Sequence, residues 1–304
     1  MVKTGREKMK ALVIGASGFV GSYLMKALQA GGADAAGTFH AHPAPSLSAL
    51  DITDPGQVSA LIKKISPELI CLCAAEPNVD YCEAHPKETS AVNVAGVKNV
   101  AEAAKAAGAK LMYFSSDYVF DGRSGPYRET DLPHPVSEYG RQKLESEKIV
   151  QGLLKDFLIL RVTVLYGWER QGKNFLERLI KTLKKGETLL VPNDQIGNPT
   201  LVPNMTEIAA ELALKNERGI FHIAGLDWIN RYEFAVRIAE TFGLDASLIA
   251  GVKTSEMKQA AKRPLRGGML CESLKGKILT KPSSIAEGLE WLKAHPKKAE
   301  CLHE

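Results

Sequence analysis

The stretch KALVIGASGFVG, residues 10–21, decides the fold predicted for this chain. Its first five residues are mostly apolar and typical of a buried strand, and residues 22–30 have helix-forming composition. Gly15, Gly18 and Gly21 lie at the junction. A glycine-rich turn between a strand and a helix lets backbone N–H groups and the helix N-terminus face a pyrophosphate. We therefore expect a dinucleotide site here, although a glycine turn without a ligand would read the same way.

Apolar runs alternate with helix-forming segments throughout the first half of the chain. The expected strands are 10–14, 35–39, 48–51, 69–75, 111–114 and 158–165, and the expected helices are 22–30, 55–65, 88–107 and 141–153. This alternation predicts an α/β fold with a doubly wound parallel sheet, in which ligands bind at the carboxyl ends of the strands.

The pattern of expected helices and strands changes after Gly167. The expected elements become shorter: helices over 174–185, 203–215 and 231–242, and strands over 189–191 and 219–223. We predict that residues 1–166 form a Rossmann domain to which 203–225 return. Residues 167–202 and 226–304 are expected to form a small substrate-binding lobe, with a Lys-rich and frayed C-terminal end.

A second stretch, residues 115–143, carries the groups needed for proton transfer. Tyr139 and Lys143 are four positions apart, so they share one face of a helix. A phenol has a pKa of about 10, and a neighbouring ammonium should lower that pKa toward the working pH. Ser116 follows the strand at 111–114 and could hold a substrate oxygen. Together they predict acid–base chemistry on a carbonyl/alcohol pair, with a hydride carrier still required.

The residues after the strand at 35–39 bear on the choice of cofactor. An acid commonly stands there and binds the ribose 2′-hydroxyl of NAD. Here the sequence reads His40-Ala41-His42, with no acid, Lys or Arg. Without the acid a 2′-phosphate is not repelled, so we expect NADP(H) to be slightly favoured over NAD(H). His40 or His42 could approach that phosphate, or both could lie in a solvated loop.

Composition excludes several classes of protein. Lys+Arg 39 against Asp+Glu 35 gives +4, too balanced to indicate nucleic acid. No apolar run reaches the ~18 residues of a membrane span, and no signal-peptide pattern opens the chain. Met9 is a second candidate start. Five unevenly placed cysteines indicate no disulfide framework, which favours a reducing cytoplasm.

A metal site is a weaker interpretation of the cysteines. Cys71, Cys73 and Cys82 with His85 could act as ligands. However, the first two lie in a predicted buried strand, where cysteine behaves as a small apolar residue. We predict no metal site.

Taken together, these residues resemble the extended short-chain dehydrogenase/reductase family. The shared marks are Gly-x-x-Gly-x-x-Gly at 15–21, Ser116 and Tyr-x-x-x-Lys at 139–143. Within that family, residues 9–292 are most similar to the dTDP-4-dehydrorhamnose reductases and related sugar-nucleotide enzymes. The matching strings are SDYVFDG at 116–122, PYRE at 126–129, GKNF at 172–175, DQIGNPT at 194–200 and Arg263-Pro264.

The resemblance implies reduction of the 4-keto group of a nucleotide-activated 6-deoxy sugar by NAD(P)H. Tyr139 would protonate the C4 oxygen, Lys143 would hold the nicotinamide ribose, and Ser116 would orient the carbonyl. Substrate contacts would come from Ser116, Asp117, Tyr139, Gln195 and Arg263. The cofactor would lie against Gly15, Ser17, Gly18, Phe19, Val20, Gly21, Asp51, Ile52, Cys73, Ala74, Ala75, Tyr139 and Lys143. A homodimer, with Mg²⁺ assisting its assembly, is possible.

Three further positions leave alternatives open. Asn93 either shapes a water relay behind Lys143 or serves as a buried structural amide. Val164 replaces the Trp usual in the reductases, and Glu76 follows the paired alanines. The Ala-Ala-Glu string is similar to that of the regulatory β subunit of methionine adenosyltransferase, so a cofactor-binding regulatory subunit is the alternative function. A 4,6-dehydratase is disfavoured, because Tyr118 stands where that reaction needs a Glu.

Overall fold

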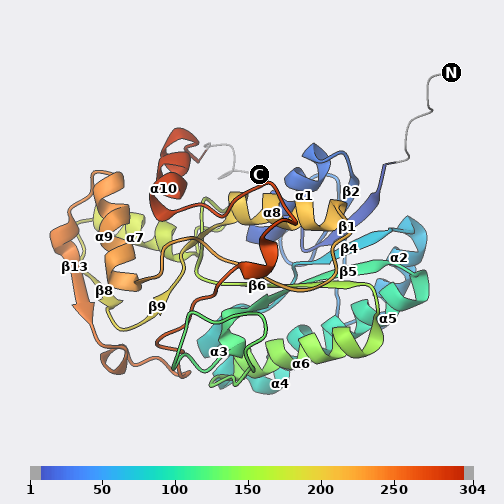
Figure 1. Cartoon of the computed structure of the whole chain (residues 1–304), viewed down its shortest axis with the longest axis horizontal. Helices are drawn as coiled ribbons and strands as arrows, with labels where there is room; N and C mark the ends of the chain where they lie inside the picture. The colour runs from blue at the N-terminus through green and yellow to red at the C-terminus, as the bar shows by residue number, and fades with distance from the viewer. Residues whose placement is uncertain (1–7, 298–304) are drawn as a thin grey trace.

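The computed structural model describes residues 8–297 and contains a seven-stranded sheet in the order β11-β6-β5-β4-β1-β2-β3 (Figure 1). All six strand pairings are parallel. The strands are β1 (Lys10–Ile14), β2 (Asp34–Phe39), β3 (Leu47–Ala49), β4 (Leu69–Leu72), β5 (Lys110–Ser116), β6 (Phe157–Val162) and β11 (Gly219–Ile223). The predicted doubly wound parallel sheet is confirmed.

Helices cover both faces of the sheet, as its apolar strands require. On one face, α1 (Phe19–Ala30) packs beside α8 (Val202–Leu214). On the other, α5 (Val97–Ala107) lies between α2 (Pro55–Ile65) and α6 (Glu138–Leu153). Side chains along β1 alternate between two buried clusters, with Val13 in the first and Leu12 in the second. The alternation anchors the sheet between its two helical layers.

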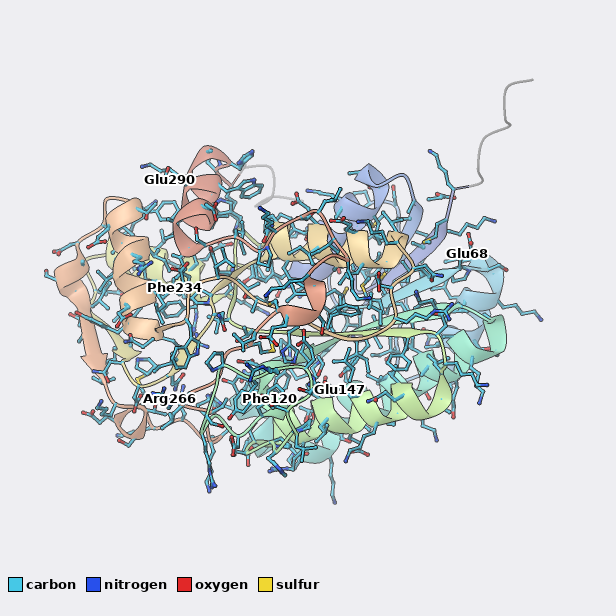
Figure 2. The ribbon with its side chains drawn as sticks, viewed as in Figure 1. Glu68, Phe120, Glu147, Phe234, Arg266 and Glu290 are labelled. Carbon is cyan, nitrogen blue, oxygen red and sulfur yellow. The ribbon has the colours of Figure 1, made fainter. Side chains whose placement is uncertain are left out.

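A third group of elements stands beyond one end of the sheet (Figure 1). It contains α7 (Phe175–Lys184), α9 (Arg231–Thr241), α10 (Ile285–Ala294) and the parallel pair β8 (Leu189–Pro192) and β13 (Ile249–Val252). Two short pairs connect it to the sheet: β7 (Leu165–Tyr166) with β10 (Thr200–Leu201), and β9 (Ile196–Gly197) with β12 (Ile229–Asn230). Its own apolar core includes Phe234, which is labelled in Figure 2.

Several element boundaries differ from those expected. The helix expected at 88–107 consists of α4 (Pro86–Ser90), a π-helical segment (Ala91–Gly96) and α5. The strand expected at 158–165 breaks into β6 and β7, because Val164 adopts a φ of +41° that no strand accommodates. The strand expected at 69–75 ends at Leu72, and the one expected at 48–51 ends at Ala49.

The elements missed from the sequence include α3 (Val79–Ala84), β13 and α10, and also the two-residue strands β9, β10 and β12. Helix α6 also begins at Glu138 rather than at 141, because the Ser137 hydroxyl accepts a hydrogen bond from Gly140 N (3.3 Å) and caps the helix. Much of the Lys-rich end expected to fray falls in 298–304, outside the described residues. Within residues 8–297, no helix has both the length and the apolar character of a membrane span.

Candidate active site

The glycine turn after β1 has the geometry of a phosphate cradle. Gly15 has a φ of +86°, and a Cβ there would lie 2.9 Å from Ala74 N. A Cβ on Gly21 would lie 2.2 Å from Gly15 O, so the turn and helix α1 approach each other as only glycine allows. Gly18 caps α1 without any side-chain hydrogen bond to the first turn. The free N–H groups of that turn suit a pyrophosphate, and the residues present therefore fit a dinucleotide.

Other residues expected to bind the cofactor lie at the same edge of the sheet as this turn. Ile14 O accepts hydrogen bonds from Cys73 N (2.9 Å) and Ala74 N (3.1 Å), which holds the residues after β4 beside the turn. Phe19 and Val20 form the start of α1. Asp51 lies beyond β3, where its Oδ1 accepts two 2.8 Å bonds from Thr53. These residues line the carboxyl edge of the sheet, as the fold predicts.

Ser116, Tyr139 and Lys143 converge at the same edge. Ser116 ends β5, while Tyr139 and Lys143 lie on successive turns of α6. Tyr139 lies close enough to Ser116 for the Ser116 side chain to lower the pKa of the phenol. Lys143 Nζ donates to Phe114 O (2.9 Å) and lies 5.7 Å from the centre of the Tyr139 ring. The structure thus brings together the three side chains that the sequence placed in one site.

Burial controls the protonation of both titratable members of this trio. It raises the pKa of Tyr139 above 10, Cys82 adds to the rise, and the nearby Ser116 side chain opposes it. Burial also lowers the pKa of Lys143 to about 8, against the raising effects of Cys82, Glu147 and Cys73. The expected lowering of the Tyr139 pKa by Lys143 is therefore wrong for the protein without cofactor, because loss of hydration is the largest effect on that pKa. At neutral pH Tyr139 carries its proton.

Asp117 is buried behind Ser116. Its Oδ2 accepts hydrogen bonds from Thr163 Oγ1 (2.6 Å) and, at 3.5 Å, from Gly268 N. Burial raises the pKa of the Asp117 carboxyl, and these donors and Ser116 partly offset the rise. Thr163 was not predicted from sequence, since its role depends on β6 lying next to β5.

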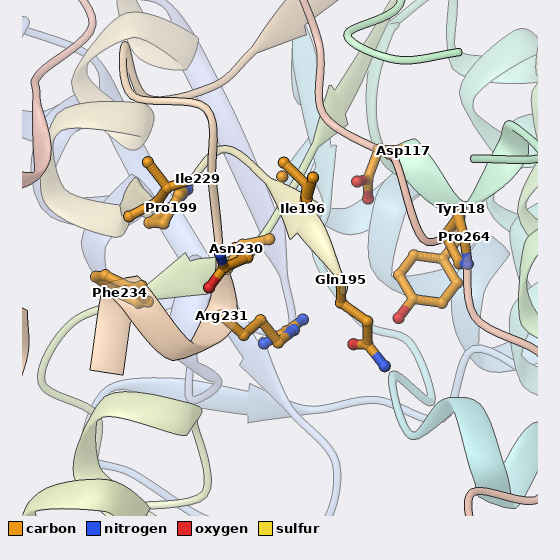
Figure 3. A pocket seen from close by; sticks show the side chains of 12 residues that line it. Asp117, Tyr118, Gln195, Ile196, Pro199, Ile229, Asn230, Arg231, Phe234 and Pro264 are labelled. Carbon is orange, nitrogen blue, oxygen red and sulfur yellow. The ribbon is translucent and has the colours of Figure 1, made fainter. Parts of the chain in front are cut away.

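Asp117 opens into a pocket between the sheet edge and α9 (Figure 3). Of the predicted substrate residues, Gln195 lines it, fixed through Nε2 to Thr254 Oγ1 (3.1 Å) and Gln259 Oε1 (3.0 Å). Arg231, from the first turn of α9, also faces it and was missed, because nothing local distinguishes it from other helix-surface arginines. The full lining is Asp117, Tyr118, Val164, Gln195, Ile196, Gly197, Pro199, Ile229, Asn230, Arg231, Phe234 and Pro264.

Arg263 borders this pocket without lining it. Its Nη2 donates to Asp80 Oδ2 (2.6 Å), and its Nη1 is buried with no hydrogen-bond partner among the described residues. The neighbouring Pro264 does line the pocket, and the charge of Arg263 helps to lower the pKa of Tyr118, which burial raises. Arg263 therefore lies beside the pocket with one guanidinium nitrogen unpaired among the described residues.

Asn93 takes a structural position in the π-helical segment. Its Oδ1 accepts from Glu76 N (2.9 Å), and its Nδ2 donates to Glu76 O (3.1 Å) and Gln142 Oε1 (2.9 Å). These bonds join the residues after β4 to α6, and they occupy the amide. These bonds support the role of a buried structural amide for Asn93, and the water-relay role stays a prediction. Among the described residues, no cluster of His, Cys, Asp or Glu could hold a metal ion.

A parallel α/β sheet with a glycine cradle and a Ser–Tyr–Lys trio at its carboxyl edge defines the class of the extended short-chain dehydrogenases/reductases. A model of the RmlD substrate binding domain family matches residues 9–295, so the chain belongs to that family.

Two curated relatives and one solved structure show how the chain compares. It is 31% identical to a probable low-salt glycan biosynthesis reductase of Haloferax volcanii, covering 94% of this chain and 98% of that protein. It is 32% identical to the methionine adenosyltransferase 2 subunit beta of Xenopus laevis, over 87% of this chain and 81% of that one. The crystal structure of dTDP-4-dehydrorhamnose reductase from Bacillus anthracis in complex with NADP superposes with a TM-score of 0.88, at 31% identity, covering 95% of this chain and all of that chain.

Proposed function

We propose that this protein is an NAD(P)H-dependent reductase of the 4-keto group of a nucleotide-activated 6-deoxy sugar, of the dTDP-4-dehydrorhamnose reductase type. One observation carries the proposal: Ser116, Tyr139 and Lys143 meet at the sheet edge that also bears the glycine cradle. The NADP complex of the Bacillus anthracis reductase supports it, since that protein shares this fold over nearly the whole chain.

The roles of the three side chains follow from their positions. A bound reduced nicotinamide would supply the hydride. Ser116 Oγ would orient the carbonyl oxygen, and Tyr139, whose raised pKa keeps it protonated, would give its proton to that oxygen as the alcohol forms. The phenolate left behind would be stabilised by the Lys143 ammonium, held beneath it by Phe114 O. Tyr139 would then recover its proton through Lys143 or from solvent.

The pocket and its border supply groups suited to the sugar and its diphosphate. Asp117 and Gln195 offer hydrogen bonds to hydroxyls, while Arg231 and Arg263 offer guanidinium groups to phosphate. This placement supports the division expected from the sequence. Residues 1–166 with 203–225 would bind the dinucleotide, and residues 167–202 and 226–304 would bind the nucleotide sugar.

The test is an assay of NADPH oxidation with 4-keto-6-deoxy sugars carried on dTDP, GDP and UDP, with the product checked by mass spectrometry. We expect one nucleotide to be preferred and the product to gain two hydrogens. Protein that binds NADPH but reduces none of these compounds would contradict the proposal.

The alternative is a cofactor-binding regulatory subunit. The 32% identity to the methionine adenosyltransferase 2 subunit beta favours it, together with Glu76, which Asn93 fixes in place. A stable complex with a methionine adenosyltransferase catalytic subunit, retained in Tyr139→Phe, would support this role. Turnover of a keto-sugar nucleotide by the isolated protein, lost in that variant, would exclude it as the main function.

The cellular compartment and the oligomeric state of the protein remain predictions. Within residues 8–297, Cys71, Cys73, Cys82 and Cys271 are all free thiols, which supports the proposed reducing cytoplasm. The possible homodimer is tested by size-exclusion chromatography with light scattering, in the presence and absence of Mg²⁺.

A further inference from the structure

The end of β2 would face the adenosine side of a bound cofactor, and neither Lys nor Arg follows it directly. In Rossmann folds this end faces the adenosine ribose, and an Arg nearby accommodates a 2′-phosphate. Here it is tied to the glycine cradle, because Gly15 N donates to Thr38 Oγ1 (3.1 Å) and Ala16 N to Thr38 O (2.8 Å). The loop that follows, residues 40–46, contains neither Lys nor Arg. A cation for a 2′-phosphate must therefore come from another part of the chain.

The loop between β7 and α7 approaches this region from across α1. A Cβ on Gly167 would lie 3.4 Å from the Phe19 ring, and Trp168 O accepts a 2.9 Å hydrogen bond from Tyr23 Oη one turn further along α1. Arg170 Nη1 then donates to Pro43 O at 3.1 Å, inside the loop after β2. These three contacts place residues 167–170 against α1 and the loop beyond β2.

Arg170 has spare capacity for an anion. Its guanidinium carries five N–H donors, and among the described residues it makes one hydrogen bond and no ion pair. The adjacent carboxylate of Glu169 accepts from the backbone and side-chain nitrogens of Asn174. Asp51, the acid beyond β3, accepts a hydrogen bond from Thr53 and lies 4.0 Å from His40. Neither carboxylate is paired with the Arg170 guanidinium.

We propose that Arg170 is a cofactor-specificity residue that binds the 2′-phosphate of NADP(H), in place of the basic residue missing after β2. The inference rests on the proposed function, since it needs a dinucleotide in the cradle. It gives the expected NADP(H) preference a source that the local sequence does not contain. His40 and His42, both exposed, would be secondary neighbours of the same phosphate.

Isothermal titration with NADP⁺, NAD⁺, 2′,5′-ADP and 5′-AMP tests the proposal without turnover. We expect wild type to bind NADP⁺ and 2′,5′-ADP more tightly than NAD⁺ and 5′-AMP, which lack the 2′-phosphate. Arg170→Ala should weaken binding of NADP⁺ and 2′,5′-ADP about tenfold, through the loss of one exposed charge-assisted contact. Binding of NAD⁺ and 5′-AMP should stay within about twofold of wild type. Arg170→Lys should fall between. The matched control is Lys173→Ala, an exposed cation in the same loop, which should change neither pair.

The results distinguish a failure of the role of Arg170 from a failure of the proposed function. Wild type that binds no dinucleotide would overturn both this proposal and the proposed function. Equal losses of affinity in Arg170→Ala for ligands with and without the 2′-phosphate, or no loss at all, would overturn only the role of Arg170. Loss in Lys173→Ala as large as in Arg170→Ala would reduce the effect to general loop charge and would also reject that role.

Discussion

Tyr139 and Lys143 show how burial selects the direction of a proton transfer. Removing water raises the pKa of the phenol and lowers that of the ammonium, so each group is shifted toward its neutral form. A reductase needs the phenol protonated before hydride arrives, and burial provides that form at neutral pH. The Lys143 ammonium is the group more easily neutralised, because its pKa has moved close to the working pH.

This gives a prediction for the pH dependence of reduction. The pKa of Lys143 is lowered to about 8, so the free protein loses that positive charge as pH rises through about 8, and kcat/KM should fall there. The measurement is the pH profile of kcat/KM for NADPH oxidation. In Lys143→Arg, whose guanidinium stays charged, activity should be lower but the falling limb should move to higher pH. A wild-type profile that stays flat well above pH 8 would contradict this role for Lys143.

Helix α6 presents the proposed acid and lysine, and a buried ion pair fixes the helix against the sheet. Glu147, one turn beyond Lys143, accepts hydrogen bonds from Arg161 Nε (2.9 Å) and Nη2 (2.7 Å). The side chains are 0% and 3% exposed, and Glu147 is labelled on α6 in Figure 2. Arg161 on β6 pairs in register with Ser115, next to Ser116. The pair therefore sets the distance between the strand tip and the helix that face each other in the site.

Breaking the Glu147–Arg161 pair should lower the free energy of unfolding. Glu147→Ala would leave a guanidinium buried without its carboxylate, and we expect the free energy of unfolding to fall by about 3–5 kcal/mol in urea titration. The matched control is Glu102→Ala, which removes an exposed i,i+4 pair with Lys98 on α5 and should cost about 0.5 kcal/mol or less. Similar small losses in both variants would show that the buried pair does not hold α6.

At the scale of the whole molecule, Asp80 and Arg263 join segments 183 positions apart. Asp80 lies on α3 beside the sheet, and Arg263 lies next to the pocket with Nη1 unpaired. We predict that Asp80→Asn, which removes the charge that holds the guanidinium, raises KM for the nucleotide sugar about five- to tenfold and leaves the Kd of NADP⁺ unchanged. The control is Asp34→Asn, an exposed acid at the opposite edge of the sheet. Equal changes in both constants would contradict the role of the pair.

The sequence predicted what depends on neighbours along the chain. The glycine turn, the alternating elements and the spacing of Tyr139 and Lys143 are local patterns, and the structure places them as expected. Sequence reasoning missed partners that only the folded chain brings together, among them Thr163 beside Asp117 and Arg231 in the pocket. It also missed the break at Val164, because a β-branched residue with positive φ is held there by its surroundings rather than by its own preference.

The central claim is that Tyr139 donates the proton that completes reduction. Tyr139→Phe removes only the hydroxyl and keeps the ring that packs edge-on against Tyr118, with centres 5.7 Å apart. The measurement is single-turnover oxidation of bound NADPH by a 4-keto-6-deoxy sugar nucleotide, in wild type and in this variant. We predict a rate about 10²- to 10⁴-fold lower in Tyr139→Phe, with the Kd of NADP⁺ unchanged. A variant that reduces the sugar nearly as fast as wild type would contradict the account.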